Sequence, residues 1–340
     1  MLINLVSDTV THPTPEMLKA MFNAKVGDDV FKADPTINAL QKKVAKMFGK
    51  EDALFCPSGT MTNQIAIKCH TQPLDEMICD INSHVYQYET GGYAFNSSVA
   101  VNLIEGQYGK ITAEQVDKAI KPNYDWLPTS KLVVLENSTN KGGGNYYSLD
   151  EIKPIHDICR KKNLKLHLDG ARLFNVLVET GETTEEVGNH FDSISICLSK
   201  GLGAPVGSLL IGDKDFIAKA RRFRKVMGGG MRQAGYLAAA CIYALDNHVT
   251  RLREDNNRAK ELGEIVSNMS WCKAVRPIKT NIVIFDLHDP ITAEFFLSKL
   301  EENQIQASAF GPTTVRFVTH LDYSNVMHQK VMSVLENLDF

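Results

Sequence analysis

Short apolar runs alternate with amphipathic segments along most of the chain. In the segment that begins at Thr36, apolar residues recur every three or four positions as far as Gly49, which is the pattern of a helix with a glycine stop. The short runs are mostly apolar, as expected for parallel strands covered on both faces. The alternation predicts a doubly wound α/β sheet with mostly parallel strands. The predicted strands lie at residues 77–79, 132–135, 164–168, 194–197 and 208–211.

Three capping boxes support the helical interpretation of segments between these runs. In each, a Ser or Thr is followed three positions later by Glu or Gln, so that side chains satisfy free N–H groups of the first helical turn. A shorter strand is expected at residues 53–56, with a helix from about Thr60. The capping pairs are Thr112 with Gln115, Ser148 with Glu151, and Thr183 with Glu186.

The rhythm of the pattern changes beyond Trp271, and the new elements predict a small α+β domain. We therefore expect a large α/β domain at residues 1–245 and a small C-terminal domain at residues 246–340. No linker rich in Pro, Gly or Ser marks the boundary, so we place it near Asp246, within a long helix. The elements predicted for the small domain are strands at 281–287 and 314–319 and helices at 292–302 and 325–337.

Composition is that of an ordinary globular protein. Lys and Arg total 37 against 40 for Asp and Glu, and the net charge of −3 excludes a strongly basic nucleic-acid binder. The longest apolar run, residues 236–245, is far shorter than the ~20 residues that a membrane-spanning helix needs. Seven cysteines without a Cys-x-x-Cys pair argue against a disulfide framework and a zinc site, and for reduced thiols in the cytoplasm. We expect no signal peptide, membrane, nucleic acid or metal.

Two strand ends carry the residues with the most specific chemistry. Lys200 follows the run 194–197 and stands before Gly201, and Asp169 ends the run 164–168. Ligands of open parallel sheets bind at the carboxyl ends of strands, so both side chains are expected at one site. A lysine that forms a Schiff base and an aspartate that keeps a ring nitrogen protonated are what pyridoxal 5′-phosphate requires. Taken singly, each residue is more often structural, as a helix cap, an ion pair or a solvated strand end.

Three further segments suit the same cofactor and an amino-acid substrate. The segment 57–60 links a strand to a helix, and its N–H groups and hydroxyls suit a phosphate, although ordinary helix capping has the same pattern. It is neither a Walker A loop nor a dinucleotide-binding fingerprint. His84 is placed to lie on a pyridine ring, or else is a capping or core histidine. Arg316, within the run 314–319, suits a carboxylate, or else is a surface arginine of an edge strand.

Read in order, these segments resemble the pyridoxal-phosphate-dependent threonine aldolases, which belong to the fold type I superfamily. The resemblance runs from end to end of the chain, and the joint order and spacing of its motifs are far more specific than any single motif. The matching segments are Ser7-Asp8-Thr9-Val10-Thr11, Pro13-Thr14-Pro15-Glu16-Met17, Val26-Gly27-Asp28-Asp29-Val30, Asp34-Pro35-Thr36, Pro57-Ser58-Gly59-Thr60-Met61, Tyr88-Glu89-Thr90-Gly91-Gly92, His167-Leu168-Asp169-Gly170-Ala171-Arg172, Leu198-Ser199-Lys200-Gly201, Gly228-Gly229-Gly230-Met231-Arg232-Gln233 and Thr280-Asn281-Ile282-Val283.

The resemblance implies a role for each candidate residue. Lys200 would form the Schiff base, Asp169 would pair with the ring nitrogen, and His84 would stack on the ring. It also implies a homotetramer built from dimers with shared active sites. The other implied positions are Gly59 and Thr60 on the phosphate, Ser7, Arg172 and Arg316 around the substrate carboxylate with Arg172 also near the cofactor, and Lys225 and Arg232 serving a neighbouring subunit.

The sequence departs from the family at two places. The family reads Glu-Asn-Thr-His-Asn after the central strand, whereas residues 136–140 here place Thr139 at the histidine position. Thr139 lies where the family contacts the substrate β-hydroxyl, and a threonine can donate a hydrogen bond there but cannot act as a base near neutral pH. Residues 31–33 read Phe-Lys-Ala, where the family commonly has Tyr-Gly-Glu, which alters the pocket rim or a subunit contact.

The sequence therefore predicts reversible cleavage of L-threonine or L-allo-threonine to glycine and acetaldehyde, with His84 moving the proton of the β-hydroxyl. The nearest alternative is another reaction of this cofactor on the same scaffold, such as β-elimination or racemisation. A non-catalytic protein that kept the fold is a further alternative, although it would be expected to have lost Lys200 or Asp169, and both are present.

Overall fold

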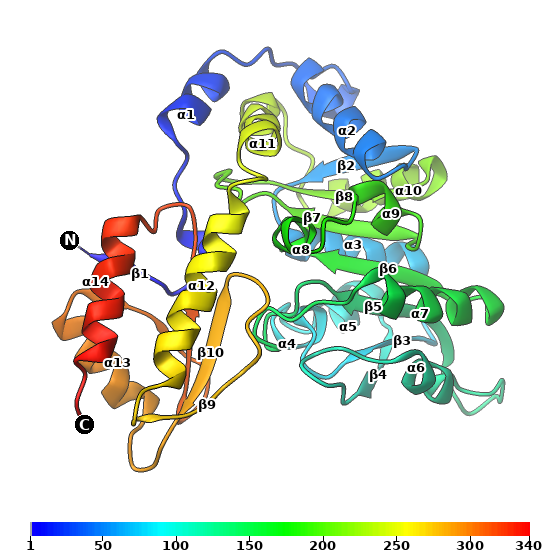
Figure 1. The fold of residues 1–340 in the computed structure, drawn as a ribbon. Coiled ribbons are helices and arrows are strands. Elements are labelled where there is room, and N and C mark those ends of the chain that lie inside the picture. The colour runs from blue at the N-terminus through cyan, green and yellow to red at the C-terminus, as the bar shows by residue number, and fades with distance from the viewer. Residues whose placement is uncertain (1) are drawn as a thin grey trace.

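The computed structural model describes residues 2–340, and a seven-stranded sheet forms its centre (Figure 1). The strands follow the order β2-β8-β7-β6-β5-β3-β4. β8 is antiparallel to both of its neighbours, and the other six strands run in one direction. The α/β class and the mostly parallel sheet are thereby confirmed. The strands are β2 (Asp52–Cys56), β3 (Asp75–Asp80), β4 (Ala100–Ile104), β5 (Thr129–Glu136), β6 (Lys165–Gly170), β7 (Ser193–Cys197) and β8 (Ser208–Gly212).

The prediction that residues 208–211 form a parallel strand was wrong. Only residues 198–207 separate β8 from β7, and this segment contains no helix. A parallel crossover needs a dozen or more residues, so a connection of this length returns the chain antiparallel. The strand is buried at every position, which is why its sequence pattern matched that of a parallel strand.

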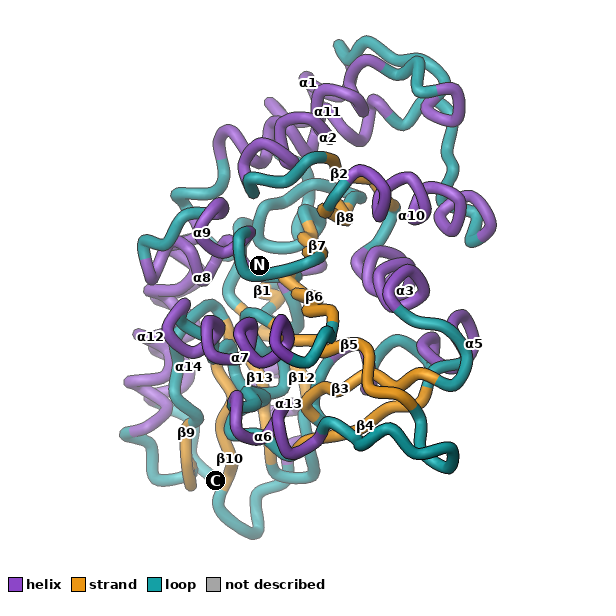
Figure 2. The backbone as a smooth tube through the Cα atoms, turned by 90° about the vertical axis from the view of Figure 1, so that its right-hand side faces the viewer, coloured by secondary structure: helices purple, strands orange, loops and turns teal. Residues whose placement is uncertain are grey.

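Helices cover both faces of this sheet (Figure 2). One face packs against α3 and α10, and the other against α2, α7, α8 and α11, with apolar clusters between each layer and the strands. The three predicted capping pairs stand at the starts of α6, α7 and α9. The helices of this part are α1 (Pro15–Phe22), α2 (Pro35–Met47), α3 (Gly59–His70), α4 (His84–Gln87), α5 (Gly92–Ser97), α6 (Ala113–Ala119), α7 (Leu149–Lys161), α8 (Leu173–Thr180), α9 (Thr184–Gly188), α10 (Lys214–Val226) and α11 (Gly235–Asn247).

A second apolar core lies in the C-terminal part of the chain. An antiparallel sheet of order β12-β13-β10-β9 packs against helices α12, α13 and α14. Ile3 and Leu5 also belong to this core, because β1 (Ile3–Asn4) pairs in parallel with β11 (Ile305–Gln306). The N-terminal segment thus links the two cores. The remaining elements are α12 (Leu252–Ser267), β9 (Cys272–Val275), β10 (Ile282–Leu287), α13 (Ala293–Glu302), β12 (Ser308–Ala309), β13 (Thr314–Val318) and α14 (Asn325–Glu336).

The segment around Asp246 is not one long helix, as the sequence pattern had suggested. α11 ends at Asn247 and α12 begins at Leu252, and α12 contacts both α8 of the large part and β10 of the small one. The division of the chain at residue 246 stays a prediction. Within residues 2–340, no helix has the length and apolar character needed to cross a bilayer. All seven cysteines are free thiols.

Candidate active site

The candidate residues gather where the parallel strands end. Asp169 lies in β6, directly beside Glu136 at the end of β5 and Ser195 of β7. Lys200 follows β7, and His84 begins α4 just after β3. The carboxyl edge of a parallel sheet is where ligands of such folds bind, so the strand order itself brings these side chains together.

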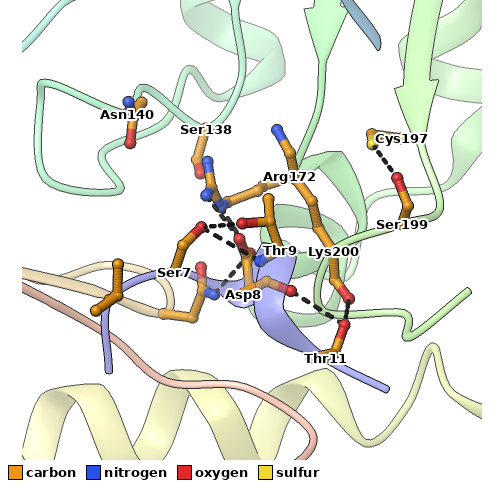
Figure 3. Close-up of polar contacts among 12 residues, drawn as sticks. Ser7, Asp8, Thr9, Thr11, Ser138, Asn140, Arg172, Cys197, Ser199 and Lys200 are labelled. Carbon is orange, nitrogen blue, oxygen red and sulfur yellow. Dashed lines mark hydrogen bonds and ion pairs between the residues drawn. The ribbon is translucent and has the colours of Figure 1, made fainter. Parts of the chain in front are cut away.

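Lys200 is half-buried on the loop after β7. Its backbone carbonyl accepts a hydrogen bond from Thr11 Oγ1 at 2.9 Å, which ties the loop to the N-terminal segment. The side chain points away from Thr11, and its nitrogen carries no dashed contact in Figure 3. Within residues 2–340 we find no hydrogen bond or ion pair to this ammonium. An amine held here without a partner is available to a ligand.

Four side chains, Asn63, His84, Glu89 and Asp169, form what we call the His84 cluster. The amide nitrogen of Asn63 lies 2.9 Å from Asp169 Oδ2 and 2.8 Å from Glu89 Oε1, so its two hydrogens serve two carboxylates. His84 Nδ1 lies 3.0 Å from Glu89 Oε1. One ring nitrogen of His84 and one carboxylate oxygen each of Glu89 and Asp169 lie within 4.8 Å of one another. The imidazole and the Asp169 carboxyl therefore face a common small volume.

Glu136 supports this cluster from the neighbouring strand. It is buried, and its carboxyl oxygens accept the backbone N–H groups of His84 at 2.8 Å and Asn140 at 2.7 Å. Burial raises the pKa of Glu136 to about 7, and the negative charge of Asp169 adds to the effect, against the hydrogen bonds from those backbone groups. One side chain thus fixes the start of α4 and the loop that carries Asn140.

Arg172 and Arg316, the arginine pair, form the opposite side of the site. Arg172 is buried and donates from Nε and from one terminal nitrogen to the two carboxyl oxygens of Asp8, each at 2.7 Å (Figure 3). Arg316 comes from β13 of the small sheet and donates to Asn140 Oδ1 and to the Val6 carbonyl, both at 2.8 Å. Its Nε is buried and has no partner.

The two positive charges of the arginine pair lie beside a single carboxylate, that of Asp8. The pKa of Arg316 is lowered to about 10, mainly by burial and also by the positive charge of Arg172. The negative charge of Asp8 opposes this effect but is too weak to cancel it. Burial alone would raise the pKa of Asp8, but the charge and hydrogen bonds of Arg172 outweigh it and hold that pKa at about 2. Two guanidinium groups beside one carboxylate suit a second anion, and planar guanidinium groups bind carboxylates well.

Ser7, Gly59 and Thr60, which were also predicted, lie at the N-terminal segment and at the start of α3. Ser7 is half-buried next to Asp8, and its hydroxyl accepts hydrogen bonds from the backbone and side chain of Thr9. Gly59 and Thr60 open α3 behind the capping hydroxyl of Ser58. Their N–H groups have no partner within the helix, which makes this end of α3 suitable for a phosphate.

Within residues 2–340, three predicted residues form no hydrogen bond with Lys200, the His84 cluster or the arginine pair. Thr139 is buried, and its hydroxyl lies 2.9 Å from the carbonyl oxygen of Tyr108, in the segment between β4 and α6, and 3.1 Å from that of Asn145 in its own loop. Lys225 and Arg232 are exposed. Arg232 donates to Asp28 at 2.9 Å.

The arrangement fits pyridoxal 5′-phosphate. A lysine without a partner and a buried carboxylate stand on neighbouring strand ends, and unpaired N–H groups lie at the start of α3. The Asp169 oxygens accept from Asn63 and from the backbone of Ala171, and each keeps a further acceptor site for a ring N–H.

Comparison with known proteins then identifies the family. The model of the beta-eliminating lyase family matches residues 4–290. The chain belongs to the beta-eliminating lyase family. Among curated proteins, the chain is 42% identical to low specificity L-threonine aldolase of Escherichia coli (strain K12). The match extends over 325 residues, which are 95% of this chain and 95% of that protein. Low-specificity L-threonine aldolase 1 of Arabidopsis thaliana is 39% identical over 325 residues, covering 94% and 91%. The predicted resemblance to threonine aldolases is confirmed.

Solved structures agree on the fold. Threonine aldolase of Leishmania major superposes with a TM-score of 0.86 at 21% identity, covering 98% of both chains. Serine palmitoyltransferase of Sphingomonas wittichii superposes with a TM-score of 0.78 at 16% identity, covering 98% of this chain and 86% of that one. This lyase-family chain therefore has the predicted fold type I architecture.

Four residues of the site were not singled out from the sequence: Asp8, Asn63, Glu89 and Glu136. Asp8 and Glu89 stand inside segments that carried the family resemblance, and Glu136 in the segment that departs from it at Thr139, but a carboxylate in a motif does not reveal which cation or amide it faces. Asn63 lies four positions after Gly59, on the same face of α3, and that helical spacing was the available signal.

Proposed function

We propose that this member of the family is a pyridoxal 5′-phosphate-dependent aldolase, which cleaves L-threonine or L-allo-threonine reversibly to glycine and acetaldehyde. The observation that carries the proposal is the juxtaposition of the partnerless Lys200 with the His84 cluster and the arginine pair. The sequence relatives, which are named low-specificity L-threonine aldolases, support the same substrate class.

Each group of the chain has a defined task in this reaction. When bound, the cofactor supplies an aromatic ring that accepts the electrons of the broken Cα–Cβ bond. Lys200 would hold the cofactor through its side-chain amine. Asp169 holds a proton on the ring nitrogen, and the arginine pair binds and orients the substrate carboxylate beside Ser7. The N–H groups of Gly59 and Thr60 bind the phosphate.

His84 is the proposed proton acceptor for the β-hydroxyl. Because Glu89 is a carboxylate, the shared hydrogen lies on His84 Nδ1, which leaves the lone pair on Nε2 free to accept a proton. Burial lowers the pKa of His84, but the hydrogen bond to Glu89 and the charges of Asp169 and Glu136 outweigh it and raise the pKa above the usual value. An imidazole that is held in one orientation is well suited to proton transfer.

The same proposal covers assembly and location. The exposed positions of Lys225 and Arg232 are consistent with a homotetramer in which they serve the site of a neighbouring subunit. Seven free cysteines are consistent with a reducing compartment, and we propose the cytoplasm.

An assay of products tests the activity. Purified protein loaded with pyridoxal phosphate should release acetaldehyde and glycine from L-threonine and L-allo-threonine, and benzaldehyde from phenylserine. Lys200→Ala should lose both this activity and the visible absorbance of the covalently bound cofactor. Release of 2-oxobutanoate and ammonia from L-threonine instead of aldehyde would assign β-elimination, which the family model's description keeps as the second candidate. Retained absorbance in Lys200→Ala would refute the cofactor role of this lysine.

A second experiment tests the proton acceptor. His84→Asn should keep the cofactor absorbance and lose most cleavage activity, because an amide in place of the imidazole cannot take up the hydroxyl proton. Cleavage near the wild-type rate at equal cofactor loading would remove His84 from this role.

A further inference from the structure

A chain of polar side chains leads away from Asp169 and ends at the last residue of α3. Asn63 Nδ2 lies 2.9 Å from Asp169 Oδ2, and Asn63 Oδ1 lies 3.1 Å from His167 Nε2. His167 Nδ1 lies 2.8 Å from Ser193 Oγ, which in turn lies 2.7 Å from His70 Nε2. We call Asn63, His167, Ser193 and His70 the relay. All but His70 are buried.

The orientation of Asn63 fixes the direction of the first hydrogen bond. Its nitrogen stands between the carboxylates of Asp169 and Glu89, and only the NH₂ end of the amide can donate to both. The carbonyl oxygen must therefore face His167. Because that oxygen only accepts, the hydrogen of the His167 ring lies on Nε2.

The remaining bonds follow from this tautomer. With Nε2 protonated, the Nδ1 atom of neutral His167 accepts the hydroxyl hydrogen of Ser193, and Ser193 Oγ then accepts from His70 Nε2. The carbonyl oxygen of Ser193 also lies 3.1 Å from His167 Nδ1, and the opposite tautomer would donate to it. That tautomer would leave His167 Nε2 and Asn63 Oδ1 as two facing acceptors, which is unfavourable in a buried site.

Neither histidine carries a charge near neutral pH. Burial lowers the pKa of His167 to about 3 and that of His70 to about 4. The relay is thus neutral, and all its hydrogen bonds donate towards the two carboxylates. Aligned hydrogen bonds polarise one another in a medium of low dielectric constant.

We propose that the relay is a set of positioning residues that holds Asn63 as a donor to both Asp169 and Glu89, through hydrogen bonds that all donate towards the two carboxylates. The proposal rests on the proposed function, in which anionic Asp169 holds the proton of the cofactor ring and anionic Glu89 orients His84. The carboxyl groups of Asp169 and Glu89 are buried, so each needs hydrogen-bond donors from the chain, and Asn63 supplies one to both.

Neutron diffraction of the full-length protein, with and without cofactor, tests the direction of the relay. It should locate a deuterium on His167 Nε2 and none on Nδ1, and the Ser193 hydroxyl should point at His167. A deuterium on Nδ1, or on both ring nitrogens, would overturn the proposal, whatever the activity of the enzyme.

Affinity for pyridoxal phosphate, measured on the full-length apoprotein, tests the consequence. His167→Phe removes the donor to Asn63 and should weaken binding by roughly tenfold or more, whereas His167→Gln replaces the donor and should restore most of it. Ser193→Ala should weaken binding by about three- to tenfold. Ser97→Ala is the matched control, because it also removes a buried hydroxyl but one that has no partner; it should leave the affinity unchanged.

The two proposals fail in different ways. A purely structural role would lower thermal stability in the relay variants and leave the affinity of the folded protein for the cofactor unchanged, and this result would refute the relay. If His167→Phe does not fold, Ser193→Ala and the neutron map decide. Absence of aldehyde release, together with the expected tautomer and affinities, would refute the aldolase assignment and keep the relay.

Discussion

The His84 cluster draws its residues from α3, α4, the α4–α5 turn and β6. The arginine pair instead joins the start of α8 to the small sheet through the N-terminal segment. In the cluster every carboxylate accepts at least two hydrogen bonds from the chain itself. In the arginine pair, Arg316 keeps a buried Nε without a partner. The carboxylates of the cluster are thus held in place by the chain itself, whereas the arginine pair keeps a buried donor that an anion could take up.

This difference has a physical consequence for binding. A preorganised cluster loses little conformational freedom when the cofactor binds, so it can set the electronic state of the ring. The arginine pair bridges two separate cores through Asp8, Val6 and Asn140, and a substrate carboxylate would add the missing bond between them. We therefore expect mutations in the cluster to reduce turnover, and mutations in the pair to weaken substrate binding.

Asp169→Asn should have the largest effect. In the proposed function Asp169 pairs with the protonated ring nitrogen of the cofactor. Loss of one partner of a buried ion pair costs about 3–5 kcal/mol, so kcat/KM for aldehyde release should fall roughly a thousandfold. Asp80→Asn is a matched control, because Asp80 is also a buried carboxyl group at a strand end, bonded to the backbone of Asn82 and Gly106. A loss below tenfold for Asp169→Asn, at equal cofactor loading, would contradict the role of the cluster.

Arg316→Lys changes the arginine pair and should weaken the binding of substrate. Lysine cannot reproduce the fork of a guanidinium, and a charged hydrogen bond contributes about 1.5–3 kcal/mol, so KM for L-threonine should rise roughly ten- to a hundredfold. The affinity for pyridoxal phosphate should stay the same. Arg258→Lys, whose side chain binds the Tyr323 carbonyl away from the site, is the control. Equal losses of substrate and cofactor affinity would abolish the distinction between the two sides.

The pH dependence of the free energy of unfolding should show how much ionised Asp8 contributes to stability. Its pKa is about 2 in the folded chain against an ordinary 3.8, so ionised Asp8 stabilises the fold above pH 4 and this contribution is lost as the pH falls through both values. The total is about 2 kcal/mol, of which about 1 kcal/mol should disappear between about pH 5 and pH 3. Urea unfolding of the wild type and Asp8→Asn at both pH values should show this narrowing difference.

Asp125→Asn, at an exposed position, is the control for that experiment. Its unfolding free energy should differ from the wild type by the same small amount at both pH values. A constant difference for Asp8→Asn as well would show that the ion pair with Arg172 does not hold the arginine pair together.

The sequence could predict those parts of the fold and site that depend on local pattern. Runs of apolar residues located the strands, and the strand ends located Lys200 and Asp169. The same runs could not give the direction of β8, because a strand buried on both faces has one pattern in either orientation. Two-residue strands such as β1 carry too little pattern to be recognised, yet β1 pairs with β11 and brings the N-terminal segment into the C-terminal core.

The partners of the site residues lay beyond local pattern. Asn63 and Asp169 are 106 positions apart, and Asp8 and Arg172 are 164 apart. Each of these contacts exists only after the sheet and the two cores have formed. The sequence could therefore name the groups that carry charge or react, but not the groups that orient them.

Thr139→Val should have the smallest effect, and it tests whether the substrate side extends into the 137–145 loop. The threonine hydroxyl lies within hydrogen-bond distance of the Tyr108 and Asn145 carbonyls, and valine has nearly the same shape without this donor. We expect a loss of about 1 kcal/mol in the free energy of unfolding, with the ratio of kcat/KM for L-threonine and L-allo-threonine unchanged. A hydroxyl whose hydrogen is donated to one of these backbone carbonyls does not also donate to the substrate hydroxyl. A changed ratio with unaltered stability would instead show that Thr139 turns towards the substrate when the arginine pair closes on its carboxylate.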